Sequence, residues 1–106
     1  MTTPKPPYYA VIFPNRRTED DEEGYAAMAK RMVELAASQP GFLGMDNARE
    51  DSGFGITVSY WDSLEAISAW RDNPEHLEAQ AMGRSKWYAT FDLHIAKVER
   101  SYSFKG

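Results

Sequence analysis

The sequence predicts an α+β domain, and two patterns support that prediction. Several short segments are rich in aromatic and β-branched residues and alternate apolar with polar positions, which is typical of strands. Other segments repeat apolar residues every three or four positions, which is typical of amphipathic helices. A chain of 106 residues suits one such domain. We expect the domain to span residues 8–106, after an extended arm of residues 1–7 that carries three prolines.

The composition argues against several classes of protein. The 3 Trp, 6 Tyr and 5 Phe residues argue against disorder. No apolar run reaches the roughly 18–20 residues that a membrane span needs, and no signal-peptide core follows Met1, so we expect a cytoplasmic protein with no membrane partner. The net charge of −4 and the scattered basic residues argue against nucleic acid as a partner. With no cysteine and only 2 histidines, we expect no metal site.

The first part of the chain predicts a strand and a helix. The strand is expected at Tyr8–Phe13, where both faces are apolar, and Pro14-Asn15 is expected to end it. The apolar stripe of the helix begins at Tyr25, and Gln39-Pro40-Gly41 ends it. The acidic residues 19–23 fit the first turns of this helix, where the helix dipole favours negative charge, and their spacing lacks the pattern of a calcium-binding loop.

The middle of the chain predicts a hairpin and a second helix. Residues 42–50 and 53–61 have the composition of strands, and the turn-forming residues between them predict an antiparallel pair. Asp62 is expected to cap the next helix, with Glu65 completing a capping box. The helix then restarts at Asn73-Pro74, where an asparagine cap precedes a proline at the first helical position.

The last part of the chain predicts a long strand. Apolar residues alternate from Phe91 to Ile95 and the strand continues to Tyr102, whereas residues 85–88 fit either a further helical turn or the approach to the strand. The order strand–helix–strand–strand–helix–strand is that of a ferredoxin-like fold, with two helices on one face of a four-stranded antiparallel sheet. The helices would leave an apolar sheet face bare, so we expect a homodimer that pairs sheet against sheet.

Five motifs point to one protein family. In chain order they are Pro40-Gly41-Phe42-Leu43-Gly44, Ser59-Tyr60-Trp61-Asp62-Ser63, Ala69-Trp70, Glu78-Ala79 and Lys97-Val98-Glu99-Arg100-Ser101-Tyr102. Together they resemble the antibiotic biosynthesis monooxygenase (ABM) family across most of residues 8–102. The resemblance implies a dimeric α/β barrel with a cavity between helices and sheet. Because that family is functionally mixed, the reaction has to be argued from the residues of the site.

Heme is the alternative cofactor that the resemblance brings. Heme-degrading members carry an Asn-Arg at the end of the first strand, a tryptophan on the second helix and a heme-ligating histidine after it. Asn15-Arg16 and Trp70 match the first two, but Gln80 stands at the histidine's position, and glutamine is not a useful iron ligand. His76, one helical turn earlier, is the substitute ligand. We therefore expect a protein that works without a cofactor, and heme is the alternative.

Three residues are the catalytic candidates. His76 follows the predicted cap Asn73, where the positive helix end favours a neutral imidazole that can accept a proton. Trp70 is expected to stack on a substrate, and Asn15 to bond one of its oxygen atoms. Each has a structural alternative: an exposed histidine at a helix start, a core tryptophan and a turn asparagine. Further candidates for substrate binding are Tyr60, Trp61, Gln80 and Trp87.

These features predict a cofactor-independent monooxygenase whose ligand is a small aromatic or polyketide-like molecule. Such an enzyme supplies an apolar pocket and a few polar groups, and the deprotonated substrate reacts with oxygen directly. Two alternatives remain open: a heme-binding, heme-degrading monooxygenase, and a non-enzymatic ligand-binding or stress-related dimer. The sequence contains no arrangement that supports a hydrolase or a nucleotide enzyme.

Overall fold

The computed structural model describes residues 4–106, and its helices and strands confirm the predicted α+β class. Residues 4–7 of the predicted arm are neither helix nor strand, and residues 1–3 lie outside the described residues. In chain order the elements are β1 (Tyr8–Arg17), α1 (Glu22–Ala37), β2 (Phe42–Arg49), β3 (Phe54–Trp61), α2 (Leu64–Arg71), α3 (Pro74–Met82), the π-helical turn η1 (Gly83–Trp87), β4 (Tyr88–Phe91) and β5 (His94–Val98).

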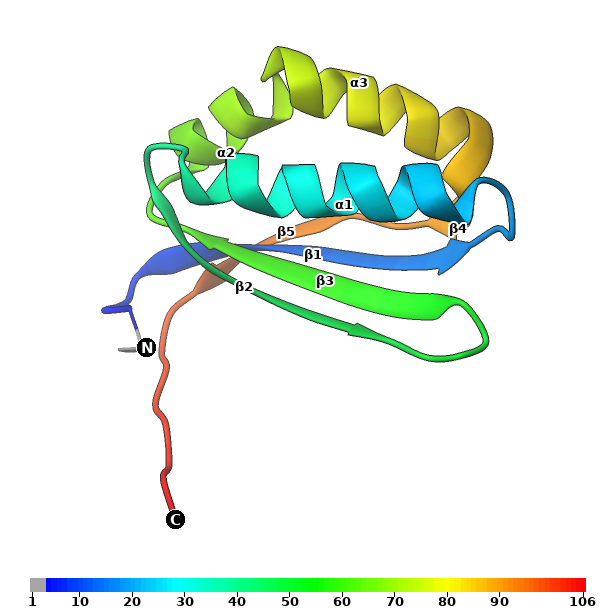
Figure 1. Ribbon diagram of the computed structural model, residues 1–106. Coiled ribbons are helices and arrows are strands. Elements are labelled where there is room, and N and C mark those ends of the chain that lie inside the picture. Colours follow the sequence, from blue (N-terminus) through cyan, green and yellow to red (C-terminus); the bar gives the residue numbers. More distant parts are fainter. Residues whose placement is uncertain (1–3) are drawn as a thin grey trace.

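The strands form one antiparallel sheet, and all the helices lie on one of its faces (Figure 1). The strand order is β2-β3-β1-β4, and β5 also pairs with β1, so β4 and β5 occupy successive parts of one edge. The sheet therefore has five strands where four were predicted, because the last predicted strand is divided. No helix within residues 4–106 is long and apolar enough to span a membrane.

The break between β4 and β5 lies beside a proline of the neighbouring strand. β1 does not end at Pro14, as predicted, but pairs Pro14 with Ile56 of β3 and continues to Arg17. On its other side, the Pro14 carbonyl accepts the backbone N–H of Asp92 (3.0 Å). The N and C=O groups of one strand residue point to the same side of the strand, so the Pro14 nitrogen also faces the break between β4 and β5. Because this nitrogen carries no hydrogen, it cannot donate a hydrogen bond there.

The second and third helices are capped by neighbouring polar side chains. Ser63 caps α2 in place of the predicted Asp62, because its hydroxyl accepts the backbone N–H of Ala66 (3.1 Å) from an extended backbone. Asn73 caps α3 as predicted, and Pro74 occupies the first turn. The short connection between α2 and α3 fixes the direction in which the residues after Asn73 point.

The C-terminal part resolves one open prediction and corrects another. The helix continues through Trp87 as η1, so the strand begins at Tyr88. The predicted long strand ends at Val98, not at Tyr102. Residues 99–106 leave the sheet as a tail on its helix-free side, where Tyr102 and Phe104 are exposed (Figure 1).

The core lies between helices and sheet, where α1 ends and α2 packs on the sheet. Its buried members are Ala36, Trp61, Ile67 and Trp70. Tyr9 pairs with Trp61 and packs against this core, so the odd-numbered residues of β1 face the helices. The even-numbered Ile12 faces the other side, opposite His94 of β5. The helix-free face is consequently apolar and partly exposed, with Ile56 40% exposed.

Candidate functional site

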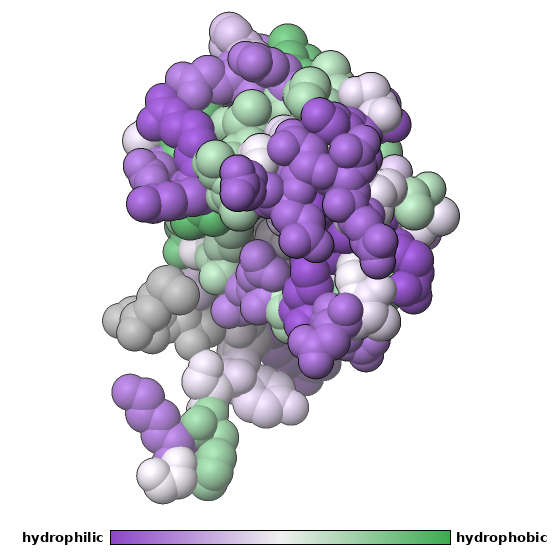
Figure 2. Space-filling model, turned by 45° about the vertical axis from the view of Figure 1, so that its right-hand side comes forward, coloured by the Kyte–Doolittle hydropathy of each residue, from purple (hydrophilic) through white to green (hydrophobic). Residues whose placement is uncertain are grey.

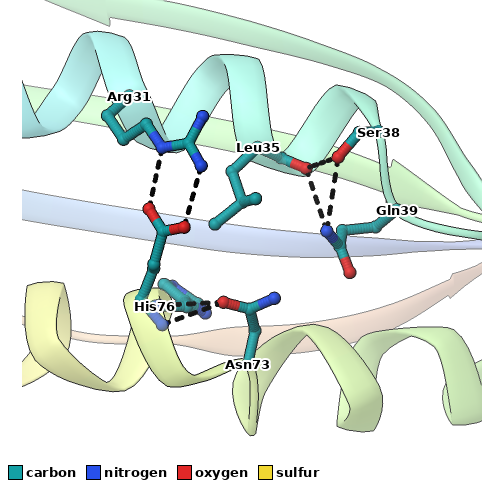
Figure 3. Close-up of polar contacts among 7 residues, drawn as sticks. Arg31, Leu35, Ser38, Gln39, Asn73 and His76 are labelled. Atoms are coloured by element: carbon teal, nitrogen blue, oxygen red, sulfur yellow. Dashed lines mark hydrogen bonds and ion pairs between the residues drawn. The ribbon is translucent and has the colours of Figure 1, made fainter.

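Trp70 and His76 form a stacked pair at the junction of α2 and α3. The ring centroids are 4.0 Å apart and the planes differ by 13°. Asn73 makes this contact by interrupting the helix, because its side-chain oxygen accepts the backbone N–H groups of Glu75 (3.0 Å) and His76 (3.3 Å) (Figure 3). The chain therefore turns back at the predicted restart and lays the imidazole on the indole.

The helix that carries His76 is also fastened to α1. The Arg31 guanidinium donates two hydrogen bonds, of 2.7 and 2.8 Å, to the carboxylate of Glu75 (Figure 3). These bonds hold the pKa of the Glu75 carboxyl below its usual range. The first turn of α3, and with it the His76 backbone, is thereby held against α1.

The surroundings of His76 assign its tautomer. Nδ1 lies 2.9 Å from the Trp70 carbonyl oxygen, which can only accept, so Nδ1 carries the proton and Nε2 keeps its lone pair. Gln80 Nε2 lies 3.4 Å from Nδ1, but it donates to the Arg71 carbonyl (2.9 Å) and makes no hydrogen bond with another donor. Burial lowers the pKa of His76, although its bond to Trp70 acts in the opposite direction.

The acceptor atom of His76 is open. No residue of the described chain bonds Nε2, whereas every buried side-chain nitrogen and oxygen in residues 4–106 has a partner. Nε2 is therefore reached by solvent, while the rest of the ring is half-buried against Trp70. A neutral imidazole with a fixed proton on one nitrogen and an accessible lone pair on the other is suited to accept a proton.

Trp61 belongs to the same aromatic group but is part of the core. It is fully buried, it stacks on Trp70 at 6.1 Å, and its indole N–H donates to the Ser59 hydroxyl (2.9 Å). Phe42 meets it edge-on at 5.4 Å. These rings fill the space between α2 and the sheet, and Trp70 itself is only 9% exposed, so a ligand here would contact His76 from the solvent side.

Tyr60 lies on the opposite face of the sheet. Its hydroxyl donates to the Asp46 carboxylate (3.0 Å), and its ring meets Tyr8 edge-on at 5.9 Å. Burial raises the pKa of Tyr60, and the bond to Asp46 adds to the increase. Because Tyr60 and Trp61 are adjacent strand residues, they point to opposite sides, and Tyr60 does not join the Trp70–His76 pair.

Asn15 and Trp87 lie toward the other end of the helices, where α1 begins. Asn15 is 2% exposed; its amide donates to the Phe13 carbonyl (3.0 Å), and its side-chain oxygen accepts from Arg49 (2.7 Å). Trp87 is buried and contacts Tyr25 edge-on at 5.8 Å. The structure thus brings together Trp61, Trp70, His76 and Gln80, and separates them from Asn15, Trp87 and Tyr60.

Sequence reasoning missed a cluster of cations and phenols beside Asn15. Arg17 lies over the ring of Tyr25 with its Cζ 3.7 Å from the centroid, and Arg49 donates to the Tyr25 hydroxyl (3.2 Å). Tyr88 meets Tyr25 edge-on at 5.9 Å, and burial raises its pKa well above the ordinary value. Extending the alternation of β1 beyond Pro14 would have placed Asn15 and Arg17 on the helix side, but that strand was expected to end.

Two clefts stand out on the molecule, and neither is lined by Trp70 or His76. One, of about 340 Å³, lies between the start of α1 and the β2–β3 turn. The other, of about 300 Å³, lies between the α1–β2 connection and the start of α2. Neither of these two clefts is therefore the cavity expected beside Trp70 between helices and sheet.

At the position of the heme-ligating histidine, the Trp70–His76 region offers no iron ligand. Gln80 stands where the resemblance places the ligating histidine, and its amide is bonded to the Arg71 carbonyl. The His76 ring is stacked on Trp70, and Trp61 fills the space behind it. Within residues 4–106, no three His, Asp or Glu side chains are grouped to hold a metal ion.

Comparisons with known proteins give relatives that match this fold and most of this chain. The sequence model of the antibiotic biosynthesis monooxygenase family matches residues 8–82. The uncharacterized protein YqjZ of Bacillus subtilis is 54% identical over 103 residues, which cover 97% of this chain and 90% of YqjZ. Jasmonate monooxygenase ABM of Pyricularia oryzae is 28% identical over 97 residues, which cover 88% of this chain and 44% of that protein.

A solved structure shares the architecture. SnoaB, a cofactor-independent oxygenase from Streptomyces nogalater, has a TM-score of 0.76 at 15% identity, covering 91% of this chain and 97% of SnoaB. At that identity the likeness concerns the fold, and it agrees with the ferredoxin-like order of strands and helices derived above. Since the family model also spans most of the sequence, this chain belongs to the antibiotic biosynthesis monooxygenase family.

Proposed function

We propose that this protein is a cofactor-independent monooxygenase that oxidises a small aromatic or polyketide-like substrate beside Trp70, with His76 as general base. The observation that carries the proposal is the fixed orientation of His76, whose Nδ1 bonds the Trp70 carbonyl while Nε2 stays open. The lowered pKa favours the neutral imidazole that can act as a base. Membership of the family, and the description of SnoaB as a cofactor-independent oxygenase, support the reaction class.

In this reaction the substrate supplies the electrons. An anthrone-type molecule carries a methylene that its aromatic neighbours acidify, and the loss of one proton to His76 Nε2 leaves a carbanion. The carbanion gives one electron to O2, and the two radicals combine into a peroxide at that carbon. Loss of water from the protonated peroxide forms a carbonyl, so one oxygen atom enters the substrate and the other leaves as water.

The protein contributes position and desolvation. Trp70 is buried and stacks on both His76 and Trp61, so it holds the imidazole in place, and its carbonyl keeps the Nδ1 proton in place while Nε2 accepts. Trp61 supports Trp70 from the core, and Gln80 borders the imidazole. Asn15 is not included, because both polar atoms of its side chain are bonded to the protein.

We also propose that two copies pair through the helix-free face of the sheet. This face is apolar, with Ile12 and Val58 paired in the middle and Ile56 exposed, and such a surface is costly in water. Sedimentation at micromolar concentration should give a dimer that Ile56→Asp weakens. A stable wild-type monomer under these conditions would contradict the pairing.

Oxygen uptake with the anthrone dithranol tests the proposed reaction. The wild type should consume oxygen and form the corresponding anthraquinone above the rate of a protein-free blank. His76→Ala should lower turnover by about 10²–10⁴-fold. Glu78→Ala is the matched control, because Glu78 is exposed on the same helix as His76, and its turnover should be unchanged.

Two outcomes would overturn the proposal. Equal turnover in the wild type and in a folded His76→Ala variant would show that His76 is not the base. Tight retention of dithranol by the wild type, without oxygen uptake above the blank, would assign the protein to the ligand-binding alternative.

A further inference from the structure

We propose that the 340 Å³ cleft at the start of α1 binds a small monocarboxylate, with Arg17 as the anchor for its carboxylate group. The cleft is bounded by Arg17, Tyr25, Arg49 and residues 50–53 of the β2–β3 turn. Small-ligand sites have volumes of about 300–1,000 Å³, so this cleft suits a ligand at the lower end of that range. It lies away from Trp70 and His76, which line neither of the two clefts.

Two positive charges meet in this cleft without a negative partner. The guanidinium carbons of Arg17 and Arg49 lie 3.7 and 5.8 Å from the centroid of the same ring, that of Tyr25. The ion pairs formed within residues 4–106 join other side chains, so neither arginine has a carboxylate within 4.0 Å. Both arginines bond only neutral oxygen atoms. Two neighbouring cations in this state attract an anion.

Arg17 is held so that one edge of its guanidinium stays available. Its Nη1 donates to the carbonyls of Thr18 (3.1 Å) and Trp87 (2.7 Å), which fix the plane of the group. Its Nε and Nη2 have no partner in the described chain, and no buried side-chain nitrogen there lacks one, so these atoms are not fully buried, and Arg17 lines the cleft. The parallel Nε–H and Nη2–H groups form the fork that a carboxylate accepts with both oxygens.

Arg49 adds a second positive charge to the cleft, and hydrogen bonds hold its guanidinium group in place. Its Nη2 donates to the side-chain oxygen of the buried Asn15 (2.7 Å), and its Nη1 is bonded to the Gly53 carbonyl of the β2–β3 turn. The buried amide therefore has a positioning role: it fixes a cation on the wall of the cleft. This gives Asn15 a use that differs from the substrate contact expected from the sequence.

The acidic residues around the cleft disfavour a ligand that carries more than one negative charge. Glu19, Glu22, Glu50 and Asp51 also line it, and their side chains are exposed. Hydrophilic side chains dominate the end of the molecule that carries the start of α1 and the β2–β3 turn (Figure 2). Solvent and salt weaken the repulsion between exposed charges, but a doubly charged phosphate meets more of it than a carboxylate does. A monocarboxylate is the better match.

Titration of the ¹⁵N-labelled wild type tests the site with benzoate, benzamide and inorganic phosphate as probes. Benzoate should shift the Arg17 Nε–H signal and the amide signals of residues 50–53 with saturation. Benzamide, which has the same ring and no charge, should leave them in place, and phosphate should bind more weakly than benzoate. Equal responses to benzoate and benzamide, or benzoate shifts confined to another region, would overturn the proposal.

Variants of Arg17 distinguish the contribution of the two parallel N–H groups to benzoate binding from that of the positive charge alone. Arg17→Gln should weaken benzoate binding by about 10- to 100-fold, and Arg17→Lys, which keeps the charge and loses the fork, should fall between it and the wild type. Arg100→Gln is the matched control, because residue 100 follows β5 beyond the opposite end of β1. Unchanged affinity in folded Arg17→Gln would overturn the proposal. If Arg17→Gln does not fold, the benzoate affinity of Arg17→Lys and the titrations of the wild type with the three probes still test the proposal.

This binding site does not depend on the proposed oxygenation. Its readout is binding without turnover, and His76→Ala should bind benzoate as the wild type does. Failure of the oxygen-uptake experiment and failure of the benzoate titration are therefore separate results.

Discussion

The two ends of the layer between helices and sheet use aromatic rings in opposite ways. Around Trp61 and Trp70 the rings stack on one another and on an imidazole, and no cation or carboxylate takes part. Around Tyr25, two guanidinium groups lie near one ring beside an open cleft. Burial lowers the pKa of a histidine at the first end and raises the pKa of a phenol, that of Tyr88, at the second. The same fold thus separates a neutral base from a cationic anchor.

Removing the deepest ring should have the largest effect. Trp61→Ala is expected to lower the free energy of unfolding by about 3–5 kcal/mol, because it empties a fully buried site and leaves the Ser59 hydroxyl without its donor. Urea denaturation measures this loss, and Trp61→Phe should recover part of it. A loss below about 1 kcal/mol would contradict the description of this end as a packed core.

Removing the buried amide at the cationic end should have the next largest effect. Asn15→Ala leaves the Arg49 guanidinium without a charge-assisted bond and should cost about 1–3 kcal/mol of unfolding free energy. Asn47→Ala, at an exposed position of β2, is the control and should change stability by less than about 0.5 kcal/mol. Equal losses in the two variants would mean that Asn15 does not hold the arginine.

The Trp70–His76 end could be anticipated from sequence because its determinants are local. Asn73 and Pro74 signal a helix restart by themselves, and that restart brings residues 70 and 76 together. The choice of Ser63 over Asp62 as the cap of α2 was missed, because either side chain can serve and the backbone of the turn decides. Trp87 was expected to bind the same substrate as Trp70, but α3 and η1 carry it to the other end of the helices.

The cationic end could not be anticipated because its partners are distant in sequence. Arg17, Tyr25 and Arg49 come from three different elements, and no spacing pattern links them. The continuation of β1 through Pro14 depends on a break in the strand across from it, at Asp92, which only the pairing of the two strands reveals. The order of helices and strands along the chain and the apolar sheet face were predictable, whereas the end of β1 and the division of the last strand were not.

The pH dependence of the free energy of unfolding tests whether His76 is desolvated. The pKa of His76 in the folded protein lies below its value in the unfolded chain. At a pH between these two values the unfolded chain therefore binds more protons. As a result, the free energy of unfolding falls as the pH drops through about 6.5 toward the folded pKa. Urea midpoints measured from pH 8 to pH 5 should show this fall in the wild type, and His76→Ala should reduce it. An identical pH dependence in both proteins would rule out a desolvated imidazole.

The smallest effect is expected at the exposed pair that fastens α3 to α1. Arg31 lowers the Glu75 pKa, so the pair stabilises the fold above the ordinary carboxyl pKa, and this contribution is lost as the pH falls through the lowered value. A carboxyl NMR titration of Arg31→Gln should show the Glu75 pKa rising toward its ordinary value, with a smaller stability loss than that of Asn15→Ala. An unchanged Glu75 pKa in this variant would contradict the ion pair between Arg31 and Glu75.

The tautomer of His76 is the most direct test of the proposed base, because it can be read without any substrate. Long-range ¹H–¹⁵N NMR of the wild type at pH 7 should show a neutral imidazole with a protonated Nδ1 and an unprotonated Nε2, as the bond to the Trp70 carbonyl requires. His94→Ala assigns the signals. A proton on Nε2 with a bare Nδ1, or a doubly protonated ring at this pH, would contradict the role of His76 as the base.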